Sequence, residues 1–399
     1  MSASSDTSSL SPHWAITGIV LAQLFGCSLW FSVNGVSHGL AADWGVTVGD
    51  LGALTAAVQA GFILGTLTLA ITGLADRFRA SDILVCSALA GAALNLGFVW
   101  FADNLVTGWA YRAAIGVCLA GIYPLGMKLI VSWSRDLPGF SLGILVGMLT
   151  LGTALPHGLA ALGADWPWQS VLVVVSAMAC VSALMVWRIG NGPYGIPKSP
   201  KLRMGAVVQA FQVPAYRGAA LGYFGHMWEL YAFWMLVPWL VLAVLGPDAS
   251  NALVSGWSFV IIGIGALGAI WAGWLGRRLG SARLAFVSLA ASGSVCAIFP
   301  WAVDWGQAVA LLLLMVWGFF VIADSAQFSA ISAKACDPKT VGSALAMQNS
   351  IGFFLSIGSI VWVSQLAETM DVSVVWWLLP GPFLGLWAMR RYLQFRAIG

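Results

Sequence analysis

Long apolar stretches alternate with short polar interruptions along the whole chain. Charged residues, prolines and polar clusters separate twelve such stretches. Each has about the 20 residues that a helix needs to cross the hydrocarbon core of a bilayer. The stretches cover residues 13–36, 50–75, 81–101, 105–131, 138–163, 168–189, 217–246, 253–276, 283–303, 306–333, 341–366 and 372–391.

These stretches predict an all-α integral membrane protein with twelve transmembrane helices. In lipid only helices and closed barrels satisfy the backbone, and uninterrupted apolar runs exclude the alternating pattern of barrel strands. The composition points the same way, because 60% of the residues are hydrophobic, 8% are charged and the mean hydropathy is +0.89. A soluble protein of this composition is excluded.

Basic residues mark alternate ends of the predicted spans. Of the 18 Lys and Arg, 16 lie at these ends or in the adjoining loops, and the opposite loops carry acidic residues without Lys or Arg. Basic ends are cytoplasmic by the positive-inside rule. The polar N-terminus lacks the positive region of a cleavable signal, so the first stretch is expected to remain as a span. We predict a multi-pass protein of the bacterial inner membrane with both termini cytoplasmic.

The longest interruption, residues 190–216, divides the spans six and six. Its proline and basic content predicts a cytoplasmic linker between an N-terminal bundle over 1–189 and a C-terminal bundle over 217–399. The halves echo one another, since LFGCSLWF at 24–31 parallels YFGHMWEL at 223–230. This weak repeat indicates two pseudo-symmetric six-helix bundles.

Two motifs resemble those of the major facilitator superfamily. TGLADRFRAS, between the second and third spans, is similar to the family's signature loop, although Thr72 and Arg79 stand where that motif has glycines. YRAAIGVCLAGIYPLG at 111–126 resembles its fourth-helix motif. The resemblance implies the family's 12-helix fold and secondary transport by a monomer through alternating access. For Asp76 and Arg77 it implies a gating loop that favours one access state, the alternative being a charge pair at the membrane edge.

Ionisable residues within the spans are the predicted proton-coupling site, because such residues are costly to bury in a membrane. Glu229 lies near the centre of the seventh span, where burial disfavours the charged carboxylate and lets it take up a proton. His226, one turn earlier on the same face, is a proton relay, a substrate contact or a satisfied interior histidine. Asp324, in the tenth span, is a second acidic site or the cap of a helix break. Arg112, inside the fourth span, is expected to bind an anionic group or to tune Glu229, or else to be held by helix-end carbonyls.

Uncharged polar and aromatic residues within the spans are candidates for a substrate cavity. Each amide is also explained as a hydrogen bond between helices. The small-residue spacings Gly61 to Gly65 and Gly143 to Gly147 predict close helix crossings in the second and fifth spans. The predicted cavity residues are Gln23, Trp30, Asn34, Arg112, Trp228, Tyr231, Trp234, Gln327, Gln348 and Asn349.

The chain has no motif for enzyme chemistry. It lacks nucleotide-binding and hydrolase motifs, its six cysteines have no metal-ligand spacing, and its basic residues form no nucleic-acid surface. We therefore expect no enzyme activity, metal, cofactor or nucleic-acid partner. The energy source must then be an ion or substrate gradient. A proton moving with the membrane field releases about 2.3 kcal/mol per 100 mV, which is enough to drive a metabolite carrier.

We predict a secondary transporter, proton-coupled, that moves a small polar or anionic organic solute across the lipid bilayer. Efflux of drug-like amphipaths by proton antiport is an alternative that the aromatic content favours. The fifth span, however, ends in Pro156 and His157 and not in the Gly-Pro pair that the resemblance to drug antiporters would require. A nitrate or nitrite porter would have an arginine inside the second and eighth spans, and neither span has one. A membrane receptor or carrier-like scaffold is the reading outside transport.

Overall fold

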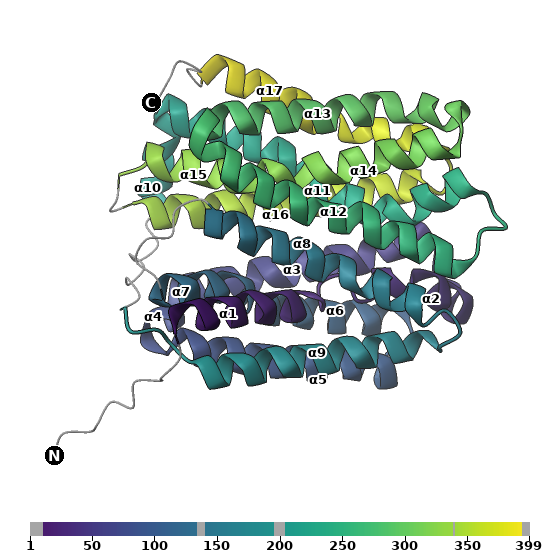
Figure 1. Ribbon diagram of the computed structural model, residues 1–399, viewed down its shortest axis with the longest axis horizontal. Helices are drawn as coiled ribbons and strands as arrows, with labels where there is room; N and C mark the ends of the chain where they lie inside the picture. Colours follow the sequence, from purple (N-terminus) through teal and green to yellow (C-terminus); the bar gives the residue numbers. More distant parts are fainter. Residues whose placement is uncertain (1–10, 134–139, 195–203, 338–339, 393–399) are drawn as a thin grey trace.

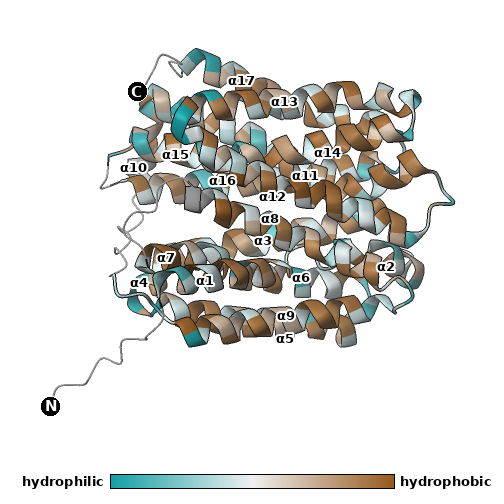
Figure 2. Ribbon diagram, in the orientation of Figure 1, coloured by the Kyte–Doolittle hydropathy of each residue, from teal (hydrophilic) through white to brown (hydrophobic). Residues whose placement is uncertain are grey.

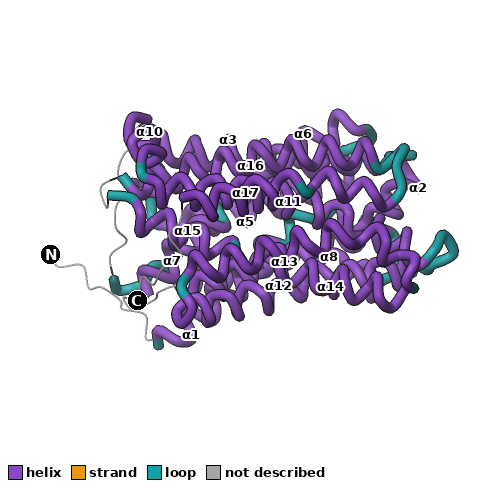
Figure 3. The backbone as a smooth tube through the Cα atoms, turned by 90° about the horizontal axis from the view of Figure 1, so that it is seen from above, coloured by secondary structure: helices purple, strands orange, loops and turns teal. Residues whose placement is uncertain are grey.

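The protein is built from long helices packed side by side. The computed structural model describes residues 11–133, 140–194, 204–337 and 340–392, and within these ranges the chain forms helices and no strand. Figure 3 shows the helices joined by short loops, most of them at the two ends of the bundle. The predicted all-α class is confirmed.

The two halves of the sequence occupy two parts of the molecule. In Figure 1 the helices of residues 12–189 lie in the lower part and those of residues 214–392 in the upper part. The first half comprises α1 (Pro12–Cys27), η1 (Asn34–Val36), α2 (Ser37–Trp44), α3 (Val48–Thr72), α4 (Leu74–Arg77), α5 (Ala80–Phe101), α6 (Leu105–Ala120), α7 (Tyr123–Trp133), α8 (Phe140–Leu162) and α9 (Trp168–Ile189). The second half comprises α10 (Met204–Gln212), α11 (Pro214–Leu245), α12 (Asn251–Leu279), α13 (Ser281–Ala302), η2 (Val303–Trp305), α14 (Gln307–Ala323), α15 (Ser325–Ala335), α16 (Val341–Leu366), η3 (Val372–Leu378) and α17 (Pro380–Tyr392).

Eleven of the predicted spans correspond to helical stretches that are long and apolar enough to cross a membrane, within the part of the chain that the structure describes. Figure 2 shows that hydrophobic residues cover most of their length. The first span, predicted over 13–36, is interrupted, because α1 has 16 residues and turns follow before η1 and α2. The first crossing therefore runs on to Trp44, and with it the twelve-helix fold is complete.

Matching interruptions occur in the fourth and tenth spans. The fourth span changes from α6 to α7 at Gly121 and Ile122, and the tenth changes from α14 to α15 at Asp324. Breaks at equivalent places agree with two pseudo-symmetric six-helix bundles. The predicted linker over 190–216 contains a helix, α10, whose Phe211 packs edge-on against Tyr216 with ring centroids 5.2 Å apart. Residues 195–203 of that linker lie outside the described residues, and the domain division itself stays a prediction.

The halves meet where α8 packs against α12 and α3 packs against α16. The predicted glycine spacing in the fifth span permits the first contact. A Cβ on Gly143 would lie 2.8 Å from the carbonyl oxygen of Ala269, and one on Gly147 would lie 3.0 Å from that of Ala266. These glycines therefore let the two backbones approach closely, as the spacing predicts.

Substituting Gly61 with alanine is expected to destabilise the fold. A Cβ at Gly61 would lie 1.9 Å from the carbonyl oxygen of Ala113, so α3 and α6 would have to separate, at a cost of about 1–3 kcal/mol. Gly256→Ala is the matched control, because its Cβ would meet nothing closer than Ala161 at 3.8 Å. Thermal unfolding of the purified variants in detergent compares the two; equal midpoints would contradict the close crossing.

Candidate functional site

Arg112 holds the interrupted segment of the first span. Its guanidinium donates from Nη1 to the carbonyl oxygen of Leu29 (3.1 Å) and to Oγ of Ser32 (2.8 Å), and from Nη2 to the carbonyl oxygen of Trp30. A helix break inside a membrane frees carbonyls that must find donors within the protein. Arg112 is fully buried and supplies these donors. Of the roles that the sequence left open, this contact matches an arginine held by helix-end carbonyls.

Asn95 extends this network through the N-terminal bundle. Its Oδ1 accepts from the hydroxyl of Ser32 (2.9 Å), and its Nδ2 donates to the carbonyl oxygen of Leu172 and to Oγ of Ser176, both at 2.9 Å. The amide thus ties the first, third and sixth spans together. Sequence reasoning missed Asn95, although a lone asparagine inside an apolar span was available as a signal.

Glu229 lies inside the C-terminal bundle with both carboxyl oxygens hydrogen-bonded. Oε1 accepts from the indole Nε1 of Trp317 (2.7 Å) and Oε2 accepts from the hydroxyl of Ser292 (3.0 Å). The side chain is fully buried. These two donors from α14 and α13 were not predicted, because a tryptophan and a serine in apolar helices resemble ordinary packing residues.

His226 and Asp324 form a buried pair next to Glu229. Nδ1 of His226 lies 2.7 Å from Oδ1 of Asp324, and the side chains are 1% and 0% exposed. His226 in turn lies one helical turn before Glu229 on α11. The three predicted acid and base residues of the second half thus lie together, and Asp324 does so from the break between α14 and α15.

Arg112 and Glu229 are not brought together. Among the described residues no hydrogen bond or ion pair joins them, since Arg112 binds the first span and Glu229 binds Trp317 and Ser292. The structure therefore separates a polar network in each bundle. No contact among the described residues therefore supports a direct effect of Arg112 on the protonation of Glu229.

An aromatic cluster fills the space between the two halves. Its members come from the first span, α3, α11 and α16: Trp30, Phe31, Phe62, Tyr231, Trp234 and Phe353. Trp30 stacks on Tyr231 and on Phe353, with ring centroids 5.8 Å apart in each pair. The indole Nε1 atoms of Trp30 and Trp234 are buried and have no partner among the described residues.

Trp228 lies elsewhere. It was predicted to line the cavity, but its Nε1 donates to the carbonyl oxygen of Trp377 (3.0 Å), and its ring packs at Gly381. Trp228 therefore contacts the last span, while Tyr231 and Trp234 belong to the aromatic cluster.

The predicted amides divide into two groups. Gln23, Asn34 and Gln348 are at least nine-tenths buried and carry side-chain polar atoms without a partner among the described residues. Gln59, which sequence reasoning missed, is buried with its whole amide unpartnered. Gln327 instead donates to the carbonyl oxygen of Ala272 (3.0 Å) and ties α15 to α12. Asn349 is half-buried.

Comparison with known proteins identifies the family. No curated protein matches the chain. The family model of the Major Facilitator Superfamily matches residues 19–360, most of the chain. The chain belongs to the Major Facilitator Superfamily.

Solved transporters share the fold of this facilitator. A bacterial homolog to the human lysosomal transporter Spinster, in an inward-facing and unoccupied conformation, superimposes with a TM-score of 0.73 at 16% identity, over 98% of this chain and 99% of that one. The nucleoside transporter NupG gives 0.68 at 13% identity, over 96% and 100% of the two chains. At these identities the likeness establishes the fold alone.

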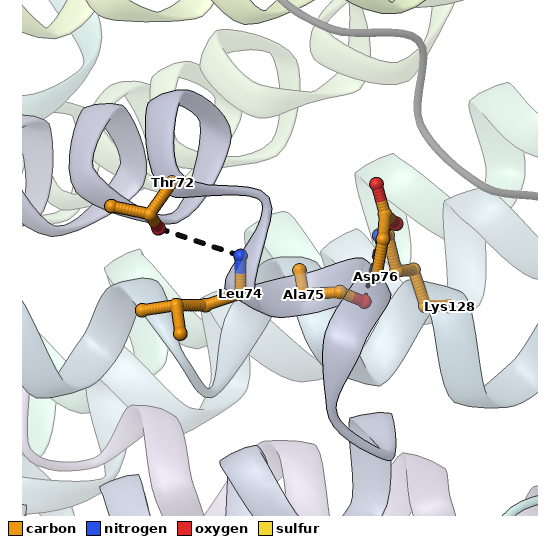
Figure 4. A network of polar contacts seen from close by, with 5 residues as sticks. All are labelled: Thr72, Leu74, Ala75, Asp76 and Lys128. Carbon is orange, nitrogen blue, oxygen red and sulfur yellow. Dashed lines mark hydrogen bonds and ion pairs between the residues drawn. The ribbon is translucent and has the colours of Figure 1, made fainter.

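An ion pair that the sequence did not indicate joins the predicted gating loop to α7. Nζ of Lys128 lies 3.1 Å from Oδ1 of Asp76 (Figure 4), and the side chains are 24% and 19% exposed. Lys128 lies inside the predicted fourth span, near its cytoplasmic end, and was not among the basic residues counted at the span ends. Gly73, with φ of 66°, ends α3 and turns the chain into α4, which places Asp76 near α7. Arg77 is exposed, and the latch role of the loop stays a prediction.

Proposed function

We propose that this facilitator is a proton-coupled secondary transporter that moves a small polar or anionic organic solute across the bacterial inner membrane, as a monomer and by alternating access. The observation that carries the proposal is the separation of two buried sets. Titratable Glu229, His226 and Asp324 lie within the C-terminal bundle, while the unpartnered indole nitrogens of Trp30 and Trp234 lie in the aromatic cluster between the bundles. One set suits proton binding and the other suits solute binding.

The neutral set supports solute binding at the centre. Buried polar groups normally find a hydrogen-bond partner, because leaving one unpaired costs about 1–3 kcal/mol. Gln348, and the indole nitrogens of Trp30 and Trp234, have none among the described residues. A polar solute held between the halves would supply these partners. Rocking of the halves about the α8–α12 and α3–α16 contacts would then expose it to one side at a time.

The acidic set supports proton coupling. Glu229 accepts two hydrogen bonds but has no positively charged partner among the described residues. His226 and Asp324 can share a proton across their 2.7 Å contact. Since α11 carries both Glu229 and Tyr231, a change of charge at the carboxyl can be transmitted to the aromatic cluster through one helix.

The test is proton movement in proteoliposomes. Pooled carboxylates, amino acids, sugars and cationic dyes are added to lightly buffered vesicles, and external pH is followed for the wild type and Glu229→Gln. Glutamine keeps the shape and one acceptor, so the variant is expected to fold and to lose the solute-dependent proton flux. Asp248→Asn, an exposed acid in a loop, is the matched control. Intact proton flux in Glu229→Gln would sink the coupling role of Glu229.

Efflux of drug-like amphipaths remains the second candidate, because the cluster of six aromatic residues would suit a planar apolar solute. The same pools separate the two functions. Proton flux with the cationic dyes alone would support antiport of amphipaths, and flux with a carboxylate, amino-acid or sugar pool would support the polar solute.

A further inference from the structure

A cavity lies at the end of the bundle that holds α2, the end that is predicted to be periplasmic. Its volume is about 280 Å³, and residues of both halves line it, from η1, α2, α8 and α9 on one side and from α11 and α12 on the other. Small-molecule sites span about 300–1,000 Å³. This cavity therefore suits a small solute better than a drug-sized one.

Asn34 lines this cavity and carries a hydrogen-bond acceptor without a partner among the described residues. Its Nδ2 donates to Oγ1 of Thr55 (2.9 Å), and the Thr55 hydroxyl in turn donates to the carbonyl oxygen of Leu51 (2.8 Å). The Thr55 hydroxyl has one proton and already donates it to Leu51, so it can only accept from Asn34. The Asn34 atom next to it must therefore be the amide nitrogen, Nδ2. Oδ1 of Asn34 is thus the free atom, and it is buried without a partner among the described residues.

His157 supplies a second polar group to the same cavity. The side chain is 1% exposed, and its Nε2 has no partner in the described part of the chain. The histidine follows Pro156 in α8, directly beneath η1. A Cβ on Gly35 would lie 2.6 Å from the carbonyl carbon of Pro156 and 2.9 Å from the backbone nitrogen of His157, so only glycine permits this contact. Gly35 therefore holds Asn34 and His157 on neighbouring backbone segments.

Apart from two histidines, His38 and His157, the walls carry no ionisable side chain. None of the residues that line the cavity is Asp, Glu, Lys or Arg. Trp168 and Trp239 contribute aromatic surface, and the indole Nε1 of Trp168 is already engaged with Oδ2 of Asp43 (2.6 Å). An ionised solute would find no counter-charge here and would lose its hydration. A carboxylate would also face the acceptor Oδ1 of Asn34 with another acceptor.

We propose that this cavity, with Asn34 and His157 as its polar ligands, binds a small neutral solute that carries hydroxyl groups. A hydroxyl donates to Oδ1 of Asn34, and a second one pairs with Nε2 of His157 as donor or acceptor. The indole faces cover the apolar C–H surface of the solute. The inference rests on the proposed function, since the cavity then receives the transported solute, and it narrows that solute from polar or anionic to neutral and hydroxylated.

The first test compares two probes of equal carbon number. Sorbitol and gluconate differ in a terminal hydroxymethyl group against a carboxylate, and xylitol and methyl glucoside extend the neutral series. Calorimetric titration of the full-length protein in nanodiscs is expected to show saturable binding of at least one neutral probe and none of gluconate. If no neutral probe binds, or if gluconate binds as tightly, the inference is overturned.

The second test assigns the binding to the cavity. His157→Leu and Asn34→Leu are each expected to weaken neutral-probe binding at least about tenfold, the equivalent of one lost hydrogen bond of about 1.4 kcal/mol. His13→Leu, an exposed histidine at the start of α1, is the matched control. Binding that is unchanged in both cavity variants would overturn the assignment.

A measurement on the wild-type protein tests the role of His157 even if the cavity variants fail to fold. The chain has four histidines, so NMR of protein labelled with ¹⁵N-histidine can follow each imidazole. Sorbitol, or whichever neutral probe binds, is expected to shift the resonances of His157 and of His38, which also lines the cavity, and to leave those of His13 and His226 in place. No shift at saturation would overturn the role of His157.

Binding needs no gradient, so its failure is separable from failure of the proposed function. Neutral-probe binding without proton flux in the wild type would overturn coupling and leave the cavity standing. Proton flux that depends on Glu229 but occurs with gluconate, without neutral-probe binding, would overturn the cavity assignment alone.

Discussion

Replacing Arg112 with methionine is expected to lower the free energy of unfolding by a large amount. Methionine fills a similar length but has no donor, so the carbonyls of Leu29 and Trp30 would lose their partner in a water-free interior. A buried unsatisfied carbonyl costs about 1–3 kcal/mol, and the two together cost about 2–6 kcal/mol. That is a large part of the stability of an ordinary protein, which is about 5–15 kcal/mol.

Thermal unfolding in detergent measures this effect, and the midpoint is expected to fall by about 2–7 °C. The midpoint of Arg112→Lys should lie between those of the wild type and Arg112→Met. The lysine ammonium can donate hydrogen bonds, but it lacks the two separate nitrogens with which the guanidinium reaches the carbonyls of Leu29 and Trp30. Arg188→Met, an exposed arginine at the end of α9, is the control and should unfold like the wild type. An unchanged midpoint in Arg112→Met would mean that other contacts hold the broken helix.

Asparagine at position 324 is expected to uncouple transport from the proton gradient. Asp324→Asn keeps the size of the side chain but removes the proton-binding partner of His226. Uphill accumulation should fall at least about tenfold, corresponding to about 1.4 kcal/mol of lost driving force. Downhill exchange of solute across the same vesicles should continue, because the aromatic cluster between the halves is untouched.

Accumulation and exchange are measured in parallel, with and without an imposed pH gradient. Asp304→Asn changes an exposed acid in η2 and serves as the control. Equal loss of accumulation and exchange in Asp324→Asn would point to a folding or solute-binding defect. Full accumulation would remove Asp324 from the coupling route and leave Glu229 as the acid to consider.

The helix pattern of this facilitator was readable from the sequence because lipid removes the alternatives. An apolar run of about 20 residues in a bilayer can satisfy its backbone only as a helix, so eleven spans were located directly. The first span was the exception. Its apolar residues continue through Ser28–Val33, and nothing in that composition marks the turns that the structure contains there.

Polar residues inside the spans were also identifiable as candidates, since each is costly in lipid. Glu229, His226, Asp324 and Arg112 are all buried, as that cost requires. The partners of these residues were not identifiable. Trp317 lies 88 residues from Glu229 in the sequence, and the carbonyl of Leu29 lies 83 residues from Arg112.

The membrane-embedded helical class, the number of crossings and the few costly residues within them could be predicted from the sequence, because they follow from local apolarity and from the cost of burying single residues. The three-dimensional arrangement was needed to find that Arg112 binds the broken first span, that His226 and Asp324 pair beside Glu229, and that Asn34 and His157 share a cavity. Such pairings depend on the rotation and crossing of helices distant in the chain. Periodicity fixes which face of a helix is polar, but packing selects the helix it meets.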